Sequence, residues 1–423
     1  MAGEKMTNEM KNISLVVNGE KRNFLVSQHE KLLDTLRNAS YFSVKSGCDS
    51  GSCGICTVLV DGRPVRSCLT KTEDVAGREV TTLEGLSKDG KMHPVQEAFV
   101  QTGAIQCGFC TPGLILSAKA LLDKNPDPTE EEIRRALNGV ICRCTGYVRA
   151  VKAVKGAAAV LRGEKLEPFS FLQTVLPENI DQVEIPEMYH RLEGGSGPLP
   201  PLVLTPVDMH GTKVVGSAEV KLDARKLALG KPVYTGDIHM EGMLHGALLT
   251  SPHAHARIRS IDTDAARALP GVHAVLTHTN ITRVKYSSGG QSYPQPLPYD
   301  QVSLDNKVRH VGDRVAIVAA ESAEIAQKAL ELIRVEYEVL PAVVDVEEAM
   351  QPGAPVIHDE TDTEGIYDPL RNIVHHVETN FGDVDKAFLE ADRVFEGEYR
   401  TQKQQHVHLE PHVCITFLDE NDR

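Results

Sequence analysis

The feature that most constrains the fold of this chain is the distribution of its nine cysteines. Eight of them fall between Cys48 and Cys144, and only Cys414 lies outside that region. In a reducing compartment, cysteines gathered in this way are typical of metal binding rather than of disulfides. The chain must therefore fold so that these sulfurs meet, and their spacing divides them into two sets of four.

The first cysteine set has the spacing Cys-x4-Cys-x2-Cys with a fourth cysteine further on, which is the plant-type arrangement for a [2Fe–2S] cluster. Its members are Cys48, Cys53, Cys56 and Cys68. Glycines in this loop let backbone N–H groups turn toward the cluster sulfurs and stabilise their negative charge. A structural zinc site is the alternative, although this spacing is uncommon for zinc.

The second cysteine set consists of two pairs, Cys107-x2-Cys110 and Cys142-x-Cys144. Each pair lies close to the start of a helical pattern, where unpaired N–H groups and the positive end of the helix dipole favour thiolates and an anionic cluster. Zinc sites and redox disulfides also use Cys-x2-Cys, so both remain alternatives. Two one-electron centres in tandem would form a path for electrons between a donor and an acceptor.

The segment around the first cysteine set predicts a small β-grasp domain of the plant-type ferredoxin kind, which we assign to residues 1–85. Residues 13–27 have the pattern of a hairpin, and its Asn18-Gly19 turn suits type I′ because both central positions need positive φ. A helix over residues 30–37 follows, and then the glycine-rich cysteine loop. A second hairpin has Asp61-Gly62 at its turn, with Cys68 expected on its return strand.

From residue 93 the apolar pattern becomes helical, and we expect a four-helix bundle over residues 93–162 within a [2Fe–2S]-binding domain of residues 86–165. Thr111 can cap a helix that has Pro112 at its first position. Thr129 and Glu132 form a capping box for the next helix.

Residues 166–205 are rich in proline and predict a linker, whereas residues 206–423 have a mixed α/β pattern. Expected helices cover residues 323–332 and 384–390. The expected strands cover residues 243–249, 272–276, 315–319, 333–337, 372–378, 394–399 and 413–418. Residues 419–423 are typical of a hairpin turn, so we expect the last domain to be truncated at a hairpin. The predicted fold class is thus an α+β multidomain chain.

Charge and hydropathy exclude several classes of partner. The net charge of −14 argues against nucleic acid, whose phosphates require a basic face. No run approaches the roughly 18 apolar residues of a membrane helix, and residues 1–6 lack the apolar core of a signal peptide. We therefore expect a cytoplasmic protein with neither a nucleic-acid nor a membrane partner.

Taken together, the motifs resemble the iron–sulfur part of the molybdenum hydroxylases, the family of xanthine dehydrogenase and aldehyde oxidoreductase. The resemblance is dense over residues 13–162 and rests on the cysteine loop at 47–68 and on residues 106–113 and 142–147. The downstream half resembles the start of the family's molybdopterin-binding region, with its hammerhead-like domain. The segments that carry this second resemblance are residues 231–237, 244–247, 251–258, 311–316 and 335–343.

The resemblance implies two [2Fe–2S] clusters and molybdopterin, with molybdopterin cytosine dinucleotide as one form of that cofactor. It implies a molybdenum that inserts a water-derived oxygen at an electron-poor C–H carbon, after which electrons leave one at a time through the clusters. All eight cysteines of the two sets would then be cluster ligands. By the same resemblance, Gln106 and the backbone near Cys144 would contact the pterin, and the first cluster would lie nearer the surface.

Several parts of the family pattern lie beyond this chain, so the resemblance assigns no catalytic residue here. We expect a partner subunit, or a missing C-terminal part, to supply the catalytic residues and to share the molybdopterin. The sequence also has no segment large enough for a flavin domain in the linker. The expected electron acceptor is therefore a separate flavin subunit or a soluble electron carrier.

Residues 286–292 and 294–296 resemble fused proteins described as selenium-dependent purine hydroxylases. The expected function is the hydroxylation of a purine or another N-heteroaromatic small molecule, with an aldehyde oxidoreductase component as the first alternative. An electron-transfer subunit without its own catalytic site and a zinc-stabilised scaffold are further alternatives. We expect His253 and His255 to cap and pack, and we do not favour a metal role for the histidines of residues 406–412.

Overall fold

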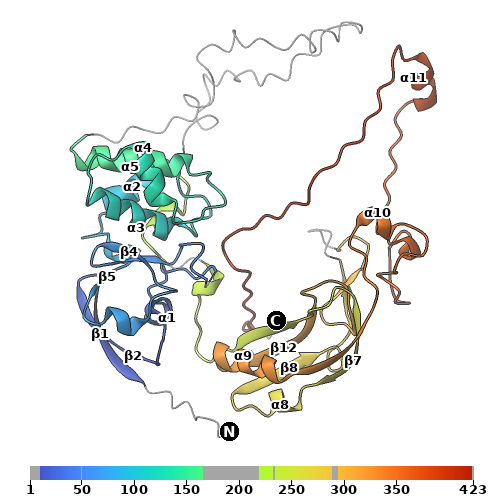
Figure 1. The fold of residues 1–423 in the computed structure, drawn as a ribbon, viewed down its shortest axis with the longest axis horizontal. Helices are drawn as coiled ribbons and strands as arrows, with labels where there is room; N and C mark the ends of the chain where they lie inside the picture. Colours follow the sequence, from blue (N-terminus) through green and yellow to red (C-terminus); the bar gives the residue numbers. More distant parts are fainter. Residues whose placement is uncertain (1–9, 49, 165–218, 232–233, 288–293, 422–423) are drawn as a thin grey trace. The chain divides into compact units, whose positions relative to one another are not determined.

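The computed structural model describes residues 10–48, 50–164, 219–231, 234–287 and 294–421 (Figure 1). These residues divide into two compact units, which we describe separately. The first comprises Met1–Ile238 together with Gln402–Arg423, and the second comprises His239–Thr401. The predicted linker at residues 166–205 lies outside the described residues.

The first unit begins with a five-stranded sheet in the order β2-β1-β5-β3-β4. Strands β1 and β5 run parallel, whereas the other neighbouring pairs are antiparallel. Apolar side chains of α1 are buried with those of the sheet in one core, which is the predicted β-grasp arrangement. The elements are β1 (Lys11–Val17), β2 (Glu20–Val26), α1 (Leu32–Asn38), β3 (Thr57–Val60), β4 (Arg63–Arg66), η1 (Thr72–Val75), β5 (Glu79–Thr81) and η2 (Leu83–Gly85).

The two hairpin turns of this sheet have the backbone geometry that their sequences predict. Asn18 and Gly19 have φ values of 54° and 85°, and Asp61 and Gly62 have values of 46° and 73°. Both central residues of each turn are thus left-handed, as type I′ requires. The expectation for Cys68 was wrong, because β4 ends at Arg66 and the cysteine lies in the turn that follows.

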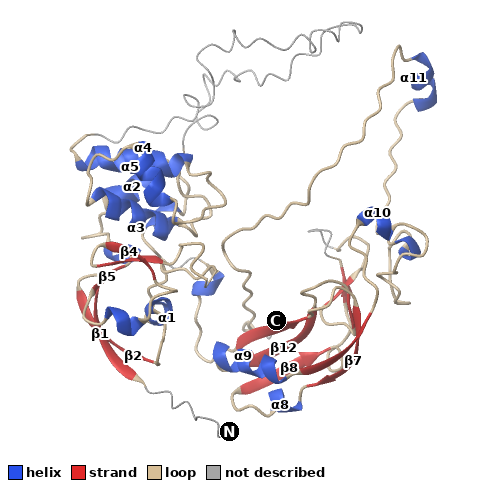
Figure 2. Cartoon of the chain, in the orientation of Figure 1, coloured by secondary structure: helices blue, strands red, loops and turns tan. Residues whose placement is uncertain are grey.

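Four helices, gathered in one bundle, follow the sheet domain as predicted (Figure 2). They are α2 (Pro94–Gln101), α3 (Thr111–Leu122), α4 (Glu130–Leu137) and α5 (Val148–Leu161). The capping box of α4 is present, since Thr129 N donates to Glu132 Oε2 at 2.8 Å and Glu132 N donates to Thr129 Oγ1 at 3.3 Å. The expected cap of α3 was wrong: the helix starts at Thr111, so Cys110 is its N-cap residue.

A short downstream segment packs against this bundle. It contains α7 (Ala224–Ala228) and η5 (Thr235–Asp237). Ala224, Leu227 and Ala228 are buried in the core that the helices of the bundle form. Gln96, which is itself buried, donates from Nε2 to Ala228 O at 2.7 Å. The chain thus returns to the cysteine-bearing helices after residue 219.

The second unit contains two three-stranded sheets, ordered β6-β12-β8 and β11-β7-β13, and the small pair β10-β9. Helix α9 packs on the first sheet through Ala326, Ala329 and Leu330. The strands are β6 (His245–Thr250), β7 (Ala256–Asp262), β8 (Val272–Thr277), β9 (Lys285–Tyr286), β10 (Gln301–Val302), β11 (Lys307–Val308), β12 (Arg314–Ala320) and β13 (Arg334–Val339). The helices are α8 (Asp264–Arg267), α9 (Ala323–Leu332), α10 (Val346–Ala349), η6 (Pro369–Arg371) and α11 (Val384–Glu390).

The strands expected at residues 372–378, 394–399 and 413–418 are not formed. Among the described residues after Val339 none belongs to a strand, and Figure 2 shows this part of the chain mainly as loop. The side chains there are largely exposed, including Phe395 and Tyr399 at 86% and 92%. A strand needs a hydrogen-bonding neighbour, so residues with strand propensity stay irregular without one. In the part of the chain that is described, no helix is both long and apolar enough to cross a membrane.

Candidate metal centres

The structure brings the first cysteine set together in one loop and the turn after β4. The sulfurs of Cys56 and Cys68 lie 3.3 Å apart. Cys53 N donates to Cys48 Sγ at 3.3 Å, as expected for a loop whose backbone faces its sulfurs. Cys53, Cys56 and Cys68 are buried and Cys48 is partly exposed, and all four are free thiols.

The electrostatics of the first cysteine set suit a bound cation. Burial is the largest influence on Cys48, but hydrogen bonds from Cys53 N and from Ser50 outweigh it and lower the pKa of Cys48 to about 6. Burial and the neighbouring thiols raise the pKa of Cys53 to about 11 and that of Cys68 to about 12. Several buried thiolates are therefore unfavourable on their own, and metal ions would stabilise them.

The structure also brings the second cysteine set together, although its two pairs lie far apart in the sequence. Cys107 Sγ and Cys144 Sγ are 3.6 Å apart, and Cys110 hydrogen-bonds to Cys142. That hydrogen bond is the largest cause that lowers the pKa of Cys142 to about 5, whereas burial raises the pKa of Cys107 to about 11. Four free thiols beside two helix starts thus form a second set, and thiolates are the donors that [2Fe–2S] clusters use.

Tyr147 fixes the loop that carries the second pair. Its hydroxyl accepts from Cys142 N at 2.8 Å and donates to Val140 O at 3.1 Å. The backbone of Tyr147 is left-handed, with φ of 66°, and the residue is the N-cap of α5. This turn presents Cys142 and Cys144 at the start of the helix.

The loops that carry the two cysteine sets touch each other directly. Ile141 N, one residue before Cys142, donates to Cys53 O at 2.8 Å. Beside that hydrogen bond, Gly54 has φ of +67°, and a Cβ built on it would lie 1.8 Å from Gly139 O. Only glycine allows this close approach, so the contact requires the residue found there.

A second contact covers the cysteine loop before α3. Tyr234 donates from its hydroxyl to Cys107 O at 2.7 Å, and its ring meets Phe109 edge to face at 5.1 Å. Gly108 has φ of +86°, and a Cβ there would come within 2.7 Å of Leu227 and 2.9 Å of the Tyr234 hydroxyl. Leu227 and Tyr234 therefore pack directly against the loop.

The pairing of two residues near this contact was not predicted from the sequence. Lys45 Nζ lies 2.6 Å from Asp237 Oδ2, and their side chains are only 4% and 2% exposed. Burial lowers the pKa of Lys45, while the hydrogen bond and charge of Asp237 oppose that shift. Asp237 follows Lys45 by 192 residues, so spacing carried no signal for the pair.

Gln106, Cys107 and Cys144 are exposed, whereas Cys110 is buried. Arg143, between the last two cysteines, donates to His406 O at 2.8 Å and to Gln405 O at 3.2 Å. The residues predicted to contact the pterin are thus exposed, and a later chain segment contacts the neighbouring Arg143.

Four histidines that the sequence analysis considered make packing or hydrogen-bonding contacts. His255 Nδ1 lies 2.6 Å from Pro341 O, and the ring of His253 meets Tyr337 at 4.9 Å. His408 and His412 contact each other edge to face at 4.6 Å. Of the predicted substrate segment, Tyr286 lies in β9 while residues 288–293 are outside the described residues.

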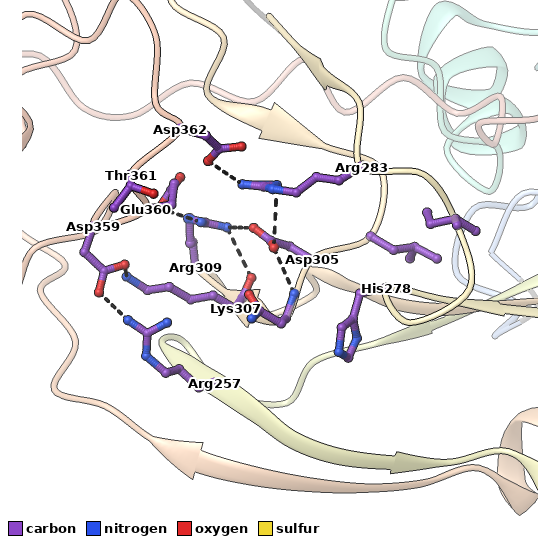
Figure 3. Close-up of a pocket in the computed structure, with 13 residues that line it drawn as sticks. Arg257, His278, Arg283, Asp305, Lys307, Arg309, Asp359, Glu360, Thr361 and Asp362 are labelled. Atoms are coloured by element: carbon purple, nitrogen blue, oxygen red, sulfur yellow. Dashed lines mark hydrogen bonds and ion pairs between the residues drawn. The ribbon is translucent and has the colours of Figure 1, made fainter.

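The second unit has a cavity of about 490 Å³ whose lining is charged rather than apolar (Figure 3). Lys307, 2% exposed, donates to Asp359 at 2.7 Å, and Arg257 pairs with the same carboxylate. Arg309 pairs with Asp305 and Glu360, both at 2.9 Å. These matched charges fasten residues 359–362 to the β7–β11 edge, so the cavity has no excess charge to attract an ion.

Comparison with known proteins identifies the domains. Four family models match: the 2Fe-2S iron-sulfur cluster binding domain over residues 15–83, the [2Fe-2S] binding domain over 82–155, the aldehyde oxidase and xanthine dehydrogenase a/b hammerhead domain over 229–341, and the molybdopterin cofactor-binding domain over 366–423. The matched cluster-binding models decide against the zinc alternatives.

Similar proteins cover the chain at moderate identity. The aldehyde oxidoreductase of Megalodesulfovibrio gigas is 34% identical over 416 residues, which are 97% of this chain and 42% of that protein. The probable hypoxanthine oxidase XdhD of Escherichia coli is 33% identical, over 96% of this chain and 42% of its own length. This chain thus spans less than half the length of these two relatives.

A shorter relative is matched over nearly its whole length. The nicotinate dehydrogenase small FeS subunit of Eubacterium barkeri is 49% identical over 146 residues, which are 34% of this chain and 93% of that subunit. The crystal structure of the aldehyde oxidoreductase from Desulfovibrio desulfuricans superposes with a TM-score of 0.68 at 36% identity, over 85% of this chain and 37% of that one. The chain belongs to the molybdenum hydroxylases, the family of xanthine dehydrogenase and aldehyde oxidoreductase, and its cofactors are two [2Fe–2S] clusters and molybdopterin.

Proposed function

We propose that this chain is the electron-transferring part of a molybdenum hydroxylase, with one [2Fe–2S] cluster on each cysteine set. The observation that carries the proposal is the contact between the two cysteine loops. Ile141 N donates a hydrogen bond to Cys53 O at 2.8 Å. Because Ile141 directly precedes Cys142, this bond connects the backbone of a first-set cysteine to the residue beside a second-set cysteine. Two clusters held in touching loops can pass single electrons from one to the other.

The exposure of the cysteines supports a direction for this transfer. Gln106, Cys107 and Cys144 are exposed, so a pterin can approach the second cluster beside them. Cys110 and Cys142 lie on the side that leads through Ile141 to the first cysteine set. Electrons would enter beside these exposed residues and leave from the first cluster to a flavin subunit or a soluble electron carrier.

The resemblance supplies the overall reaction. A molybdenum bound to molybdopterin supports hydroxylation of an electron-poor carbon, in which substrate and water give the hydroxylated product, two protons and two electrons. This chain's part is to take up those two electrons one at a time. Each [2Fe–2S] cluster is a one-electron centre, so two clusters in series fit that task.

For the substrate we propose a purine or another N-heteroaromatic compound. Relatives named as a probable hypoxanthine oxidase, a nicotinate dehydrogenase small FeS subunit and a nicotine 6-hydroxylase small subunit support this class. An aldehyde is the second candidate, because aldehyde oxidoreductases match most of this chain in both sequence and structure.

We further propose that polypeptide of the molybdopterin-binding domain covers residues 372–421, either continuous with this chain or on a partner subunit. Large apolar side chains in this segment are exposed to an extent that a folded domain does not tolerate. They include Val377, Phe381, Leu389, Phe395, Tyr399, Phe417 and Leu418, each at least 66% exposed. Such strand-forming residues would pair with added strands.

The test is an anaerobic purification of the full chain together with any polypeptide that copurifies, such as the product of the neighbouring reading frame. Iron, molybdenum and the EPR spectrum of the reduced protein are measured, and hypoxanthine, nicotinate and benzaldehyde are assayed with a dye acceptor. The proposal expects about four irons per chain, two EPR signals and molybdenum in the complex. Iron without molybdenum or a partner would instead support an electron-transfer protein, and oxidation of benzaldehyde alone would overturn the substrate class.

A further inference from the structure

A buried group of charges lies beside the second cysteine set and plays no part in holding a cluster. It consists of Lys45, Arg37 and Asp237, with the ring of Tyr234 against them. Lys45 Nζ is 2.6 Å from Asp237 Oδ2, and Arg37 reaches Asp237 Oδ1 at 3.4 Å and Gly236 O at 2.8 Å. A buried ion pair rarely stabilises a fold more than apolar residues of the same volume would. Stability alone therefore does not account for this group, and we consider a functional role.

Direct contacts connect this group to the cysteine loop. Lys45 Nζ lies 4.4 Å from the centroid of the Tyr234 ring and 6.0 Å from that of Phe109. Phe109 stands between Cys107 and Cys110 in the sequence, and the Tyr234 hydroxyl donates to Cys107 O at 2.7 Å. The charged group thus lies against two rings, one of which belongs to the cysteine loop while the other hydrogen-bonds to it.

Two cations, Lys45 and Arg37, share the carboxylate of Asp237, and Glu84 is a further acidic group that acts on Lys45. Removal of the Lys45 charge therefore makes the surroundings of the cysteine loop more negative. Lys45 and Asp237 are 4% and 2% exposed, so water does not screen the charge effectively. The hydrogen bond from Tyr234 adds a second influence, since it engages the negative end of the peptide dipole at Cys107. Both features favour additional negative charge in the neighbouring loop.

We propose that Lys45 and Tyr234 are positioning residues that raise the reduction potential of the cluster held by the second cysteine set. The proposal rests on the assignment of a cluster to that set under the proposed function. Reduction adds one electron to the cluster and neither makes nor breaks a bond, so the reduced form differs from the oxidised form by one negative charge. A fixed buried cation and an oriented dipole stabilise the reduced form, and hydrogen bonds and nearby charge are the known controls on such potentials.

The test is an EPR-monitored redox titration of the full chain, with dithionite as reductant, in which the midpoint potentials of both clusters are determined. Lys45→Met removes the charge, and Asp237 still has Arg37 as its partner. Tyr234→Phe removes only the hydroxyl and keeps the ring against Phe109. In each variant we expect the ratio of reduced to oxidised second cluster at a fixed potential to fall three- to tenfold. That change corresponds to about 30–60 mV, at 59 mV per tenfold change for one electron.

Two control variants separate tuning from simple damage. Lys45→Arg keeps the cation and is expected to restore most of the wild-type potential. Lys71→Met removes a cation three residues after Cys68, matching the position of Lys45 three residues before Cys48. The Lys71 side chain is 38% exposed, so water screens its charge. We expect Lys71→Met to change the ratio of reduced to oxidised second cluster by less than about 1.5-fold.

The outcomes also distinguish this inference from the proposed function. If wild-type protein lacked two cluster signals, the cluster assignment itself would fail. Both signals could be present while neither Lys45→Met nor Tyr234→Phe changed the ratio of reduced to oxidised second cluster by more than about 1.5-fold. That result would refute the tuning role. If Lys45→Arg lowered the ratio of reduced to oxidised second cluster as much as Lys45→Met does, the role of the charge would be refuted.

Discussion

Substitution of Gly54 by alanine tests the contact between the two cysteine loops. Gly54 is left-handed, and an added Cβ would lie 1.8 Å from Gly139 O, where at least 3.0 Å is needed. The backbone conformation costs about 1–2 kcal/mol for a residue with a Cβ. The clash with a backbone oxygen adds about 1–3 kcal/mol, as overpacking usually does. The expected total for Gly54→Ala is therefore about 2–5 kcal/mol.

Gly62→Ala is the matched control for this substitution. Gly62 has φ of +73°, close to that of Gly54, but a Cβ there meets no atom within 4 Å. Gly62→Ala should lower the stability of the fold only by the backbone contribution of about 1–2 kcal/mol. Gly139→Ala is a second control, because its own Cβ would point into open space while its carbonyl stays in place. We expect the smallest effect there.

The assay follows the loss of the visible circular dichroism of the clusters on heating. All variants are scanned at one rate, because many multidomain proteins unfold irreversibly and their apparent midpoints then depend on the scan rate. Gly54→Ala should lower the apparent midpoint by clearly more than Gly62→Ala, by roughly 2–4 °C for each additional kcal/mol. Equal midpoints for these two variants would refute the inference that the loops touch at Gly54.

Three further predictions concern the fold around the centres and the charged cavity. Thr129→Ala should destabilise the helical domain by about 1 kcal/mol through loss of the capping box with Glu132, measured by urea unfolding; an unchanged midpoint would contradict it. Lys307→Met should lower the thermal midpoint of the second unit less than loss of a fully buried pair would, because Asp359 is 36% exposed and keeps Arg257 as a partner; a gain in stability would show that the pair is not needed. Burial raises the pKa of Glu360, but His358 and Arg309 outweigh it and hold that pKa well below its usual range. Glu360 therefore contributes stability at pH values above about 4.3, its usual pKa, and that contribution should fall as the pH drops below this value; a Glu360→Gln variant with the same acid dependence would refute this.

Local features of this fold follow directly from the sequence. The turns at Asn18-Gly19 and Asp61-Gly62 need left-handed residues, and the sequence places suitable ones there. The capping box at Thr129 is likewise a property of four consecutive residues. The cysteine spacings belong to the same class, because a cluster loop fixes its ligands at short separations.

Long-range contacts could not be predicted in the same way. The ion pair between Lys45 and Asp237 joins residues from distant parts of the chain, and neither residue type signals its partner. The hydrogen bond from Ile141 to Cys53 is a backbone contact, which side-chain patterns do not encode. The strands expected after residue 372 failed for a related reason: alternating apolar residues indicate strand propensity, but a strand forms only when a neighbouring strand is available.

The most direct test of the account is the iron content of single-cysteine variants, one from each set. Anaerobically purified wild-type protein should contain about four irons per chain, in two clusters. Cys53→Ser and Cys110→Ser should each reduce this to about two irons and remove a different one of the two EPR signals. If either variant kept all of its iron, or if wild-type protein held only about two irons, the assignment of one cluster to each cysteine set would be contradicted.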